Sequence, residues 1–293
     1  PFPLTGAFSA THVEDRDQIA IFDFAGNYDR NLSSGDINLE ARSVVAKEFF
    51  RTHPDKYDFL VVFTTFEFDT GNAAAYYLGL KNDIEGIGQP IFDYSELFGS
   101  QGKLQGIIDM AAVTRWESDP IQPDFENTMM VLSHEFMHRW GPMVRYRNGS
   151  GEISDALIGH QNVHWSYLLD SNASVMYGAK WRNNQDGSYT SVLTRKFYSP
   201  LDLYLMGLKP AEEVPPFTLI QNPEVDKFQL PKLNAIETGS VETVTIDQII
   251  AAEGERVPNF ENSQREFRVG FVLLKGATTP IRDEVIGGLA KVR

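Results

Sequence analysis

The stretch LSHEFMHRWG, residues 132–141, decides how the rest of the chain is interpreted. It contains the pattern His-Glu-x-x-His, in which His134 and His138 stand four residues apart. Side chains four apart on an α-helix lie on one face, a turn above each other. The two imidazoles would therefore point at one spot, as the first two ligands of a divalent metal ion do. Glu135 would lie beside that ion, placed to act on a metal-bound water rather than to bind the metal.

The residues before this motif predict the helix that the motif needs. Apolar side chains recur at steps of four and three, which is typical of a helix with one face in a core. We predict a helix over residues 125–140, with Asp124 as its N-cap and Gly141-Pro142 as its end. The apolar stripe consists of Phe125, Met129, Leu132, Phe136 and Trp140.

The composition is that of a folded protein with a sizeable core. The chain has 293 residues, of which 42% are hydrophobic, and this suits one large domain or two closely joined lobes. Its formal net charge of −14 argues against nucleic acid and anionic membrane surfaces as partners, because both bind basic faces. Cysteine is absent, so a zinc site must use His, Asp or Glu.

Membrane and export signals are absent from the sequence pattern. No run approaches the roughly 18 consecutive apolar residues that a membrane helix needs. The first residues carry neither the basic nor the apolar part of a secretory signal, so we expect that the chain lacks one or begins after it. The acidic, cysteine-free composition is compatible with a prokaryotic secreted enzyme. We expect a secreted, extracellular protein, with a cytosolic location as the alternative.

The first 141 residues are predicted to combine strands with helices. The run at 57–66 is apolar throughout its middle, which predicts a strand buried on both faces of a sheet. Residues 38–53 have the apolar spacing of an amphipathic helix. Further strands are predicted at 18–24, 73–80 and 104–110, and residues 1–17 are expected to be irregular.

Residues 142–293 are predicted to contain few regular elements. Ser199 and Asp202 have the spacing of a capping box, a well-formed start for a helix at 199–207. The other predictions are a short capped helix at 245–253, a last strand at 267–275, a hairpin turn at 183–188, and irregular segments at 144–154 and 209–240.

These predictions together give an α+β fold, with a twisted mixed β-sheet backed by helices. The sheet and the motif helix belong to an N-terminal subdomain of residues 1–141. A C-terminal subdomain of residues 142–293, with few regular elements, completes one catalytic domain.

A third metal ligand must come from downstream of the motif, because a catalytic zinc usually takes three protein ligands and a water. Four of the six histidines fall between residues 134 and 164, and clustered histidines indicate a metal site. A surface helix with two incidental histidines is the alternative. The candidates for the third ligand are His160, His164 and the acidic residues Glu152, Asp155 and Asp170.

The segment HEFMHRWG, residues 134–141, resembles the first eight positions of the metzincin zinc-peptidase signature, His-Glu-x-x-His-x-x-Gly-x-x-His. The signature places its third ligand at position 144, which is Val144 here. Some metzincin-like enzymes carry an insertion before the third histidine, then a turn with a methionine beneath the zinc, then a C-terminal helix. The segment SVMY, residues 174–177, is similar to that turn, and the helix at 199–207 follows it. The resemblance covers roughly residues 18–208.

This resemblance implies a zincin-like fold and one zinc ion. The zinc ligands would be His134, His138 and His164, with His160 as the alternative third ligand. Glu135 would be the general base that takes a proton from the zinc-bound water. Tyr177 is the candidate for a phenol that assists catalysis, with plain packing as its alternative. Whether calcium also binds is not readable from the sequence.

The resulting prediction is a zinc-dependent endopeptidase that hydrolyses peptide bonds in proteins or peptides. A strand on the rim of the cleft would bind the extended substrate by strand addition, and residues 73–80 or 104–110 could supply it. One alternative is a zinc hydrolase or amidase with a non-peptide substrate. The other is a non-enzymatic module with a structural zinc, which would be closed by four ligands including both His160 and His164.

Overall fold

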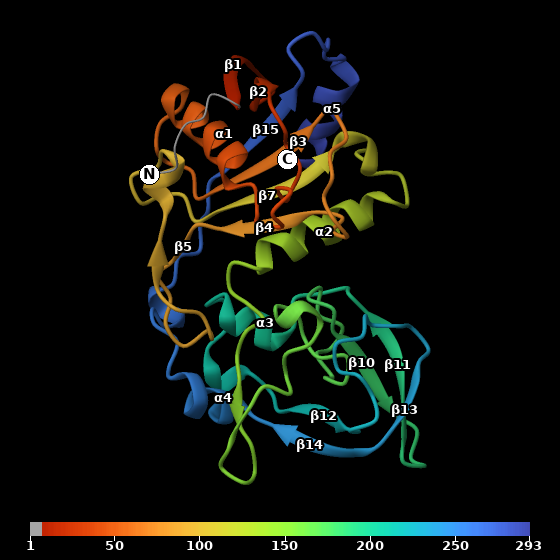
Figure 1. The fold of residues 1–293 in the computed structure, drawn as a ribbon. Coiled ribbons are helices and arrows are strands. Elements are labelled where there is room, and N and C mark those ends of the chain that lie inside the picture. The colour runs from red at the N-terminus through yellow and green to blue at the C-terminus, as the bar shows by residue number, and fades with distance from the viewer. Residues whose placement is uncertain (1–7) are drawn as a thin grey trace. The chain divides into compact units, whose positions relative to one another are not determined.

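The computed structural model describes residues 8–293, whose path is drawn in Figure 1. The chain forms two compact units. The first contains the residues up to Asn82, Phe92–Phe136 and Glu266–Arg293, and the second contains Asp83–Ile91 and Met137–Arg265. The expected division after residue 141 assigns residues 266–293 to the C-terminal subdomain, whereas their contacts place them in the first unit.

A mixed six-stranded sheet forms the centre of the first unit. Its strands are β1 (Ser9–Arg16), β2 (Ile19–Ala25), β3 (Phe59–Thr64), β4 (Tyr76–Gly79), β7 (Gly106–Ala112) and β15 (Val269–Lys275). They lie in the order β1-β2-β15-β3-β7-β4. Neighbours from β2 to β7 are parallel, and the edge strands β1 and β4 are antiparallel to their neighbours. The α+β class predicted from the sequence is confirmed.

Five of the predicted strands are confirmed, namely those at 18–24, 57–66, 73–80, 104–110 and 267–275. Every residue of β3 is buried, as its apolar sequence predicted. The prediction that residues 1–17 are irregular is wrong for β1, and residues 1–7 lie outside the described residues. The strand β1 has mostly exposed or half-buried polar residues, so it lacks the apolar pattern that reveals a strand.

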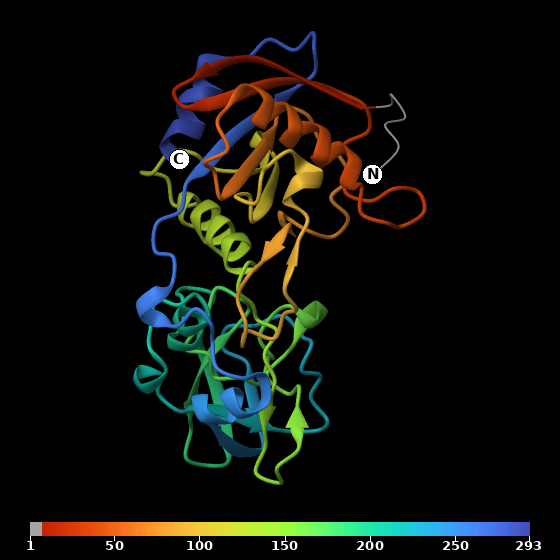
Figure 2. The ribbon, with the colours of Figure 1, turned by 90° about the vertical axis from the view of Figure 1, so that its left-hand side faces the viewer.

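Helices cover both faces of this sheet. The helix α1 (Leu39–Thr52) packs on one face and α2 (Phe125–Met137) on the other, together with α5 (Asp283–Val292) (Figures 1 and 2). Alternate residues of β3 build the two cores, because successive side chains of a strand point to opposite faces. Leu60 and Val62 pack on the side of α1, and Val61 and Phe63 on the side of α2 and α5.

The predicted helices agree with α1 and α2 in their main features. Asn38 is the N-cap of α1, and its side chain accepts a hydrogen bond from the Ala41 N–H. The apolar stripe of α2 faces the sheet, with Leu132 buried in the core and Phe125, Met129 and Phe136 packed against it. The prediction that this helix reaches residue 140 is wrong, because α2 ends at Met137 and residues 138–140 form a turn.

The second unit has few regular elements, as predicted. Its helices are α3 (Pro200–Leu205) and α4 (Ile246–Glu253), and both begin with the predicted capping box. Its strands are β8 (Tyr146–Arg147), β9 (Ile153–Ser154), β10 (Ala179–Asn183), β11 (Ser188–Thr194), β12 (Phe217–Gln221), β13 (Ile236–Thr238) and β14 (Ser240–Val244). The hairpin turn predicted at 183–188 joins β10 to β11. The prediction that 144–154 and 209–240 are irregular is wrong where β8, β9, β12 and β13 form. The strands β8, β9 and β13 have only two or three residues, and β12 directly follows the prolines at 215 and 216.

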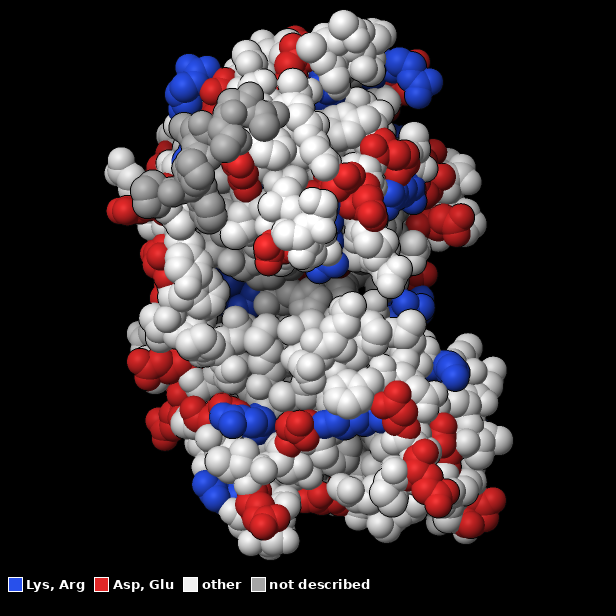
Figure 3. Space-filling model, in the orientation of Figure 1, with Lys and Arg blue, Asp and Glu red and all other residues white. Residues whose placement is uncertain are grey.

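Short elements complete the description. They are β5 (Lys81–Asn82), β6 (Phe92–Asp93) and the 3-10 turns η1 (Ser95–Phe98), η2 (Val113–Arg115), η3 (His160–Asn162), η4 (Ala211–Glu213) and η5 (Phe260–Asn262). Acidic and basic side chains are interspersed over the face drawn in Figure 3. Within residues 8–293, no helix has the length and apolar character needed to cross a bilayer.

Candidate metal centre

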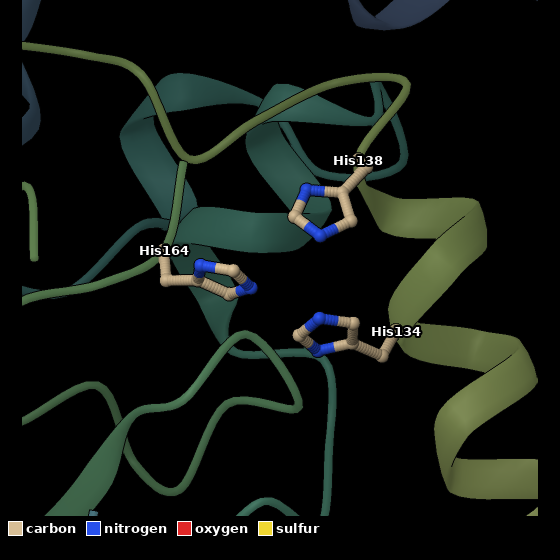
Figure 4. Close-up of side chains that lie close together, drawn as sticks. All are labelled: His134, His138 and His164. Carbon is tan, nitrogen blue, oxygen red and sulfur yellow. The ribbon is translucent and has the colours of Figure 1, made fainter. Parts of the chain in front are cut away.

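Three imidazoles gather at the end of α2. One ring nitrogen from each of His134, His138 and His164 lies within 4.8 Å of the others, and Figure 4 shows the three rings facing one another. A tetrahedral zinc ion with nitrogen ligands at about 2.0–2.1 Å would hold such nitrogens about 3.3 Å apart. The group is therefore close to the arrangement that a metal ion needs, and its donors are those that zinc accepts.

The helix itself brings the first two histidines together. His134 lies in the last turn of α2, and His138 directly follows the end of the helix. The core packing of Leu132 and Phe136 fixes the rotation of α2, because the apolar stripe must face the sheet. His134 is then directed to a different side of the helix from that stripe. It is 94% buried, so its imidazole is largely shielded from solvent.

His164 is oriented by its neighbours in the second unit. Its ring lies 4.9 Å from the His138 ring, edge to face. Its Nδ1 atom lies 2.8 Å from the carbonyl oxygen of His160, and a carbonyl can only accept a hydrogen bond. Nδ1 therefore carries the proton, and Nε2 keeps the lone pair with which a neutral histidine binds a metal.

The other candidates for the third ligand lie outside this group. The His160 ring is directed to another partner, since its Nδ1 lies 3.2 Å from the carbonyl oxygen of Phe228. Asp155 pairs with Lys227 at 2.8 Å. Glu152 and Asp170 are also absent from the described side chains that gather around His134. The structure thus brings His164 to the motif histidines, and His160 contributes its backbone carbonyl.

Tyr177 packs directly on His164. The two rings are stacked, with centroids 4.1 Å apart and planes 10° from parallel. The backbone of Tyr177 has a positive φ of 68°, an uncommon conformation that turns the chain at the end of the SVMY segment. Met176, the residue before it, is completely buried. In this structure, therefore, Tyr177 supports the imidazole of His164, and its role as a catalytic phenol stays a prediction.

A buried carboxylate ties the His164 segment to the SVMY segment and to α3. Asp202 is fully buried and accepts hydrogen bonds from the Trp165 indole N–H at 2.8 Å and the Ser199 backbone N–H at 2.7 Å. The backbone N–H of Trp165 donates to the carbonyl of Met176 at 3.0 Å. Burial raises the pKa of Asp202, and hydrogen bonds from Ser174, Ser199 and Trp165 oppose that shift. Sequence reasoning found Asp202 only as a helix cap.

Glu135 lies in the first unit in a buried position beside the edge strand β4. Only 4% of its surface is exposed, and its carboxylate accepts a hydrogen bond from the backbone N–H of Tyr77. The pKa of Glu135 is raised to about 8: burial raises it most, the Tyr77 N–H and the charge of Arg30 lower it, and the negative charge of Asp109 contributes a smaller increase. The Tyr77 N–H and the end of α2 thus fix where this carboxylate lies.

Asp109 belongs to a buried polar cluster that sequence reasoning missed. It forms an ion pair with Arg42 at 3.1 Å, and neither side chain is exposed. The Tyr76 hydroxyl donates to the same carboxylate at 2.9 Å, and the Arg42 guanidinium lies 3.9 Å from the centre of the Tyr28 ring. A single aspartate within the apolar strand GIIDMAA was the available signal, because a buried charge needs a partner.

Comparison of the chain with protein-family models, with curated proteins and with solved structures gave no match.

Proposed function

We propose that this protein is a zinc-dependent endopeptidase of the metzincin-like type. The observation that carries the proposal is the gathering of His134, His138 and His164, with the buried Glu135 directly after His134 in α2. Three neutral histidines are a common ligand set of catalytic zinc, and they leave a coordination position for water. A zinc ion bound there would acidify that water and polarise a substrate carbonyl.

The remaining chemistry belongs to residues of the chain. Glu135 accepts the proton that the attacking water loses and delivers it to the amine that leaves when the peptide bond breaks. The hydrogen bond from the Tyr77 N–H holds its carboxylate in one orientation. His134, His138 and His164 would supply the nitrogen ligands, and the stack of Tyr177 on His164 limits rotation of that ring.

The edge strand β4 supports a peptide as the substrate. Of the two strands expected to bind substrate, β7 is paired on both sides, by β3 and β4, and β4 lies at the edge of the sheet. An edge strand offers backbone groups to which an extended peptide can add. The Tyr77 N–H of β4 already bonds to Glu135, so a peptide added there would lie beside the proposed base.

The ligand count argues against the structural-zinc alternative. A structural site is closed by four protein ligands, and that alternative needs both His160 and His164. Within the described residues only three histidines gather, and the His160 ring is directed to the Phe228 carbonyl. A hydrolase with a non-peptide substrate would use the same residues, so only the choice of assay substrates can distinguish it from an endopeptidase.

The deciding experiment is the substitution Glu135→Gln, with casein, short peptides and small amides as substrates. We expect wild-type protein to cleave casein and the variant to lose activity by about a hundredfold to ten-thousandfold, because the general base is gone. Bound zinc, measured by elemental analysis, should stay at one ion at this centre. Undiminished activity of the variant would refute the proposal, and cleavage of small amides alone would favour the non-peptide hydrolase.

A further inference from the structure

Two of the histidines outside the candidate metal centre also lie together. His12 on β1 and His53 at the C-cap of α1 approach the same carboxylate, that of Asp15 on β1. One ligand atom from each of the three lies within 4.8 Å of the others. We propose that His12, Asp15 and His53 form a second zinc site, entirely within the first unit.

The contacts converge on the Asp15 carboxylate. The Nε2 atom of His12 lies 2.8 Å from Oδ1 of Asp15. The Nε2 atom of His53 lies 3.2 Å from both Oδ1 and Oδ2. The two imidazole rings meet edge to face, 5.3 Å apart. Two nitrogen donors and one carboxylate oxygen are thus directed to one place, and this donor set suits zinc.

The environment of His53 fixes its orientation and places a hydrogen on Nδ1. Its ring is stacked on Phe49 at 4.2 Å, and its Nδ1 lies 3.0 Å from the Phe49 carbonyl oxygen, so Nδ1 donates to it. Thr52 Oγ1, 2.9 Å from Nδ1, can donate its own hydrogen to the Glu48 carbonyl at 3.1 Å. If the ring is neutral, the lone pair of its Nε2 faces both oxygens of Asp15. Two lone pairs repel each other, so this contact needs a metal ion or a proton between the nitrogen and the carboxylate.

A metal ion satisfies this cluster better than protons do. Two protonated rings 5.3 Å apart would repel each other, whereas one zinc ion can accept a lone pair from each. The nearby carboxylate of Glu48 is occupied, because it accepts the backbone N–H of His12 at 2.8 Å and pairs with Arg51 at 2.6 Å. Asp15 is therefore the acidic ligand of the site.

The position of the site indicates that its ion stabilises the fold, with three protein ligands and a water rather than the four protein ligands of a closed structural zinc. It joins the edge strand β1 to the end of α1, two segments that are 38 residues apart along the chain at Asp15 and His53. A ligand that binds only the folded chain raises its stability by mass action. Half of the Asp15 side chain is exposed, so solvent can reach the fourth coordination position. This zinc would therefore stabilise the packing of β1 against the end of α1.

The test begins with the double variant His134→Ala/His138→Ala, which disables the candidate metal centre. Titration with zinc alone, followed by calorimetry and thermal unfolding, should give one ion per chain and a higher Tm. Adding His53→Ala should abolish both effects, and adding Asp15→Asn should weaken zinc binding by at least about tenfold, since a charged ligand is lost. The matched control Asp17→Asn, two residues from Asp15 and exposed, should bind zinc like its parent.

A second measurement removes the dependence on the double variant. The wild-type protein, dialysed against zinc and then buffer, should retain two ions per chain, and the single variant His53→Ala should retain one. Casein cleavage should be equal in these two proteins, because His53 takes no part in the proposed catalytic centre. The same number of ions in wild type and His53→Ala, or equal zinc binding by wild type and both Asp15→Asn and His53→Ala, would overturn the proposal.

Discussion

His164 has two interactions that prepare an imidazole for metal binding. The carbonyl of His160 holds the Nδ1 proton, and the flat contact with Tyr177 limits rotation of the ring. The sequence favoured His164 through its resemblance to the metzincin order of parts and kept His160, four residues away, as the alternative. The difference between them depends on which ring faces His138, and residue type alone does not encode it.

Replacing His164 should therefore affect the metal far more than replacing His160. We expect His164→Ala to lose zinc at this centre and all peptidase activity, because a site with two ligands binds zinc weakly. His160→Ala is the control: its backbone carbonyl remains, so zinc content and activity should stay close to those of the wild type. Elemental analysis and casein cleavage measure both. If His160→Ala loses zinc and His164→Ala retains it, then His160 and not His164 is the third ligand.

The ring and the hydroxyl of Tyr177 can be tested separately. Tyr177→Phe keeps the aromatic stack, so zinc affinity should be unchanged. Tyr177→Ala removes the stack, and zinc affinity should fall by about tenfold to a hundredfold, as is typical when a residue that orients a ligand is lost. Competition with a chelator measures the affinity. If the kcat of Tyr177→Phe falls by more than tenfold at full zinc loading, the phenol takes part in catalysis.

At the scale of elements, regular apolar spacing made α1 and α2 predictable, and a continuous apolar run made β3 predictable. The strand β1 has neither pattern, so it was not predicted. The helix α5 was also missed, since its sequence contains Gly287-Gly288, which lowers helix propensity. Its apolar residues Ile286 and Leu289 pack in the core with α2. Strand order could not be predicted either, because the position of β15 between β2 and β3 depends on tertiary packing.

The link between α3 and the His164 segment can be tested at Asp202. Both carboxylate oxygens accept hydrogen bonds in a buried place, so Asp202→Asn leaves one donor without its acceptor. The free energy of unfolding should fall by about 1–3 kcal/mol. Urea unfolding measures it. The control Asp247→Asn, in the first turn of α4, should cost less than about 1 kcal/mol because it loses only a helix-dipole interaction.

The same carboxyl predicts a dependence on pH. Burial raises the pKa of Asp202 in the folded chain above its unfolded value of about 3.9. Folding therefore favours the protonated form, so this contribution to stability is complete below the unfolded pKa and is lost as pH rises through the folded pKa. The stability difference between wild type and Asp202→Asn should narrow from pH 4 to pH 8. A difference that widens over this range would contradict the assignment.

At the scale of the whole molecule, the last residues of the chain belong to the unit that begins it. The sequence predicted the strand at 267–275 but assigned it, with the rest of residues 142–293, to a C-terminal subdomain. In the structure β15 is hydrogen-bonded to β2 and β3, and Gly270 to Leu274 are buried. Residues 266–293 are thus part of the core on which α2 packs.

A charge in the middle of β15 should therefore disrupt the first unit. Val272 is completely buried, and Val272→Asp would bury an unpaired carboxylate, so we expect loss of more than about 4 kcal/mol of stability. Val241→Asp is the control, because Val241 on β14 is 46% exposed. Its free energy of unfolding should change by less than about 0.5 kcal/mol, the usual range for surface substitutions. Near-ultraviolet circular dichroism and urea unfolding compare them.

The central place of β15 has a consequence for biosynthesis. Before residue 269 is translated, β2 and β3 each have one backbone edge without a neighbouring strand. The helix α2 also lacks the part of its apolar core that Phe271 and Leu273 supply. Pairing between segments so distant along the chain is slow, and exposed strand edges invite association with other chains. The nascent polypeptide must therefore be shielded from aggregation until residue 275 has emerged, and α2 with His134 can settle on its core only after translation of that strand.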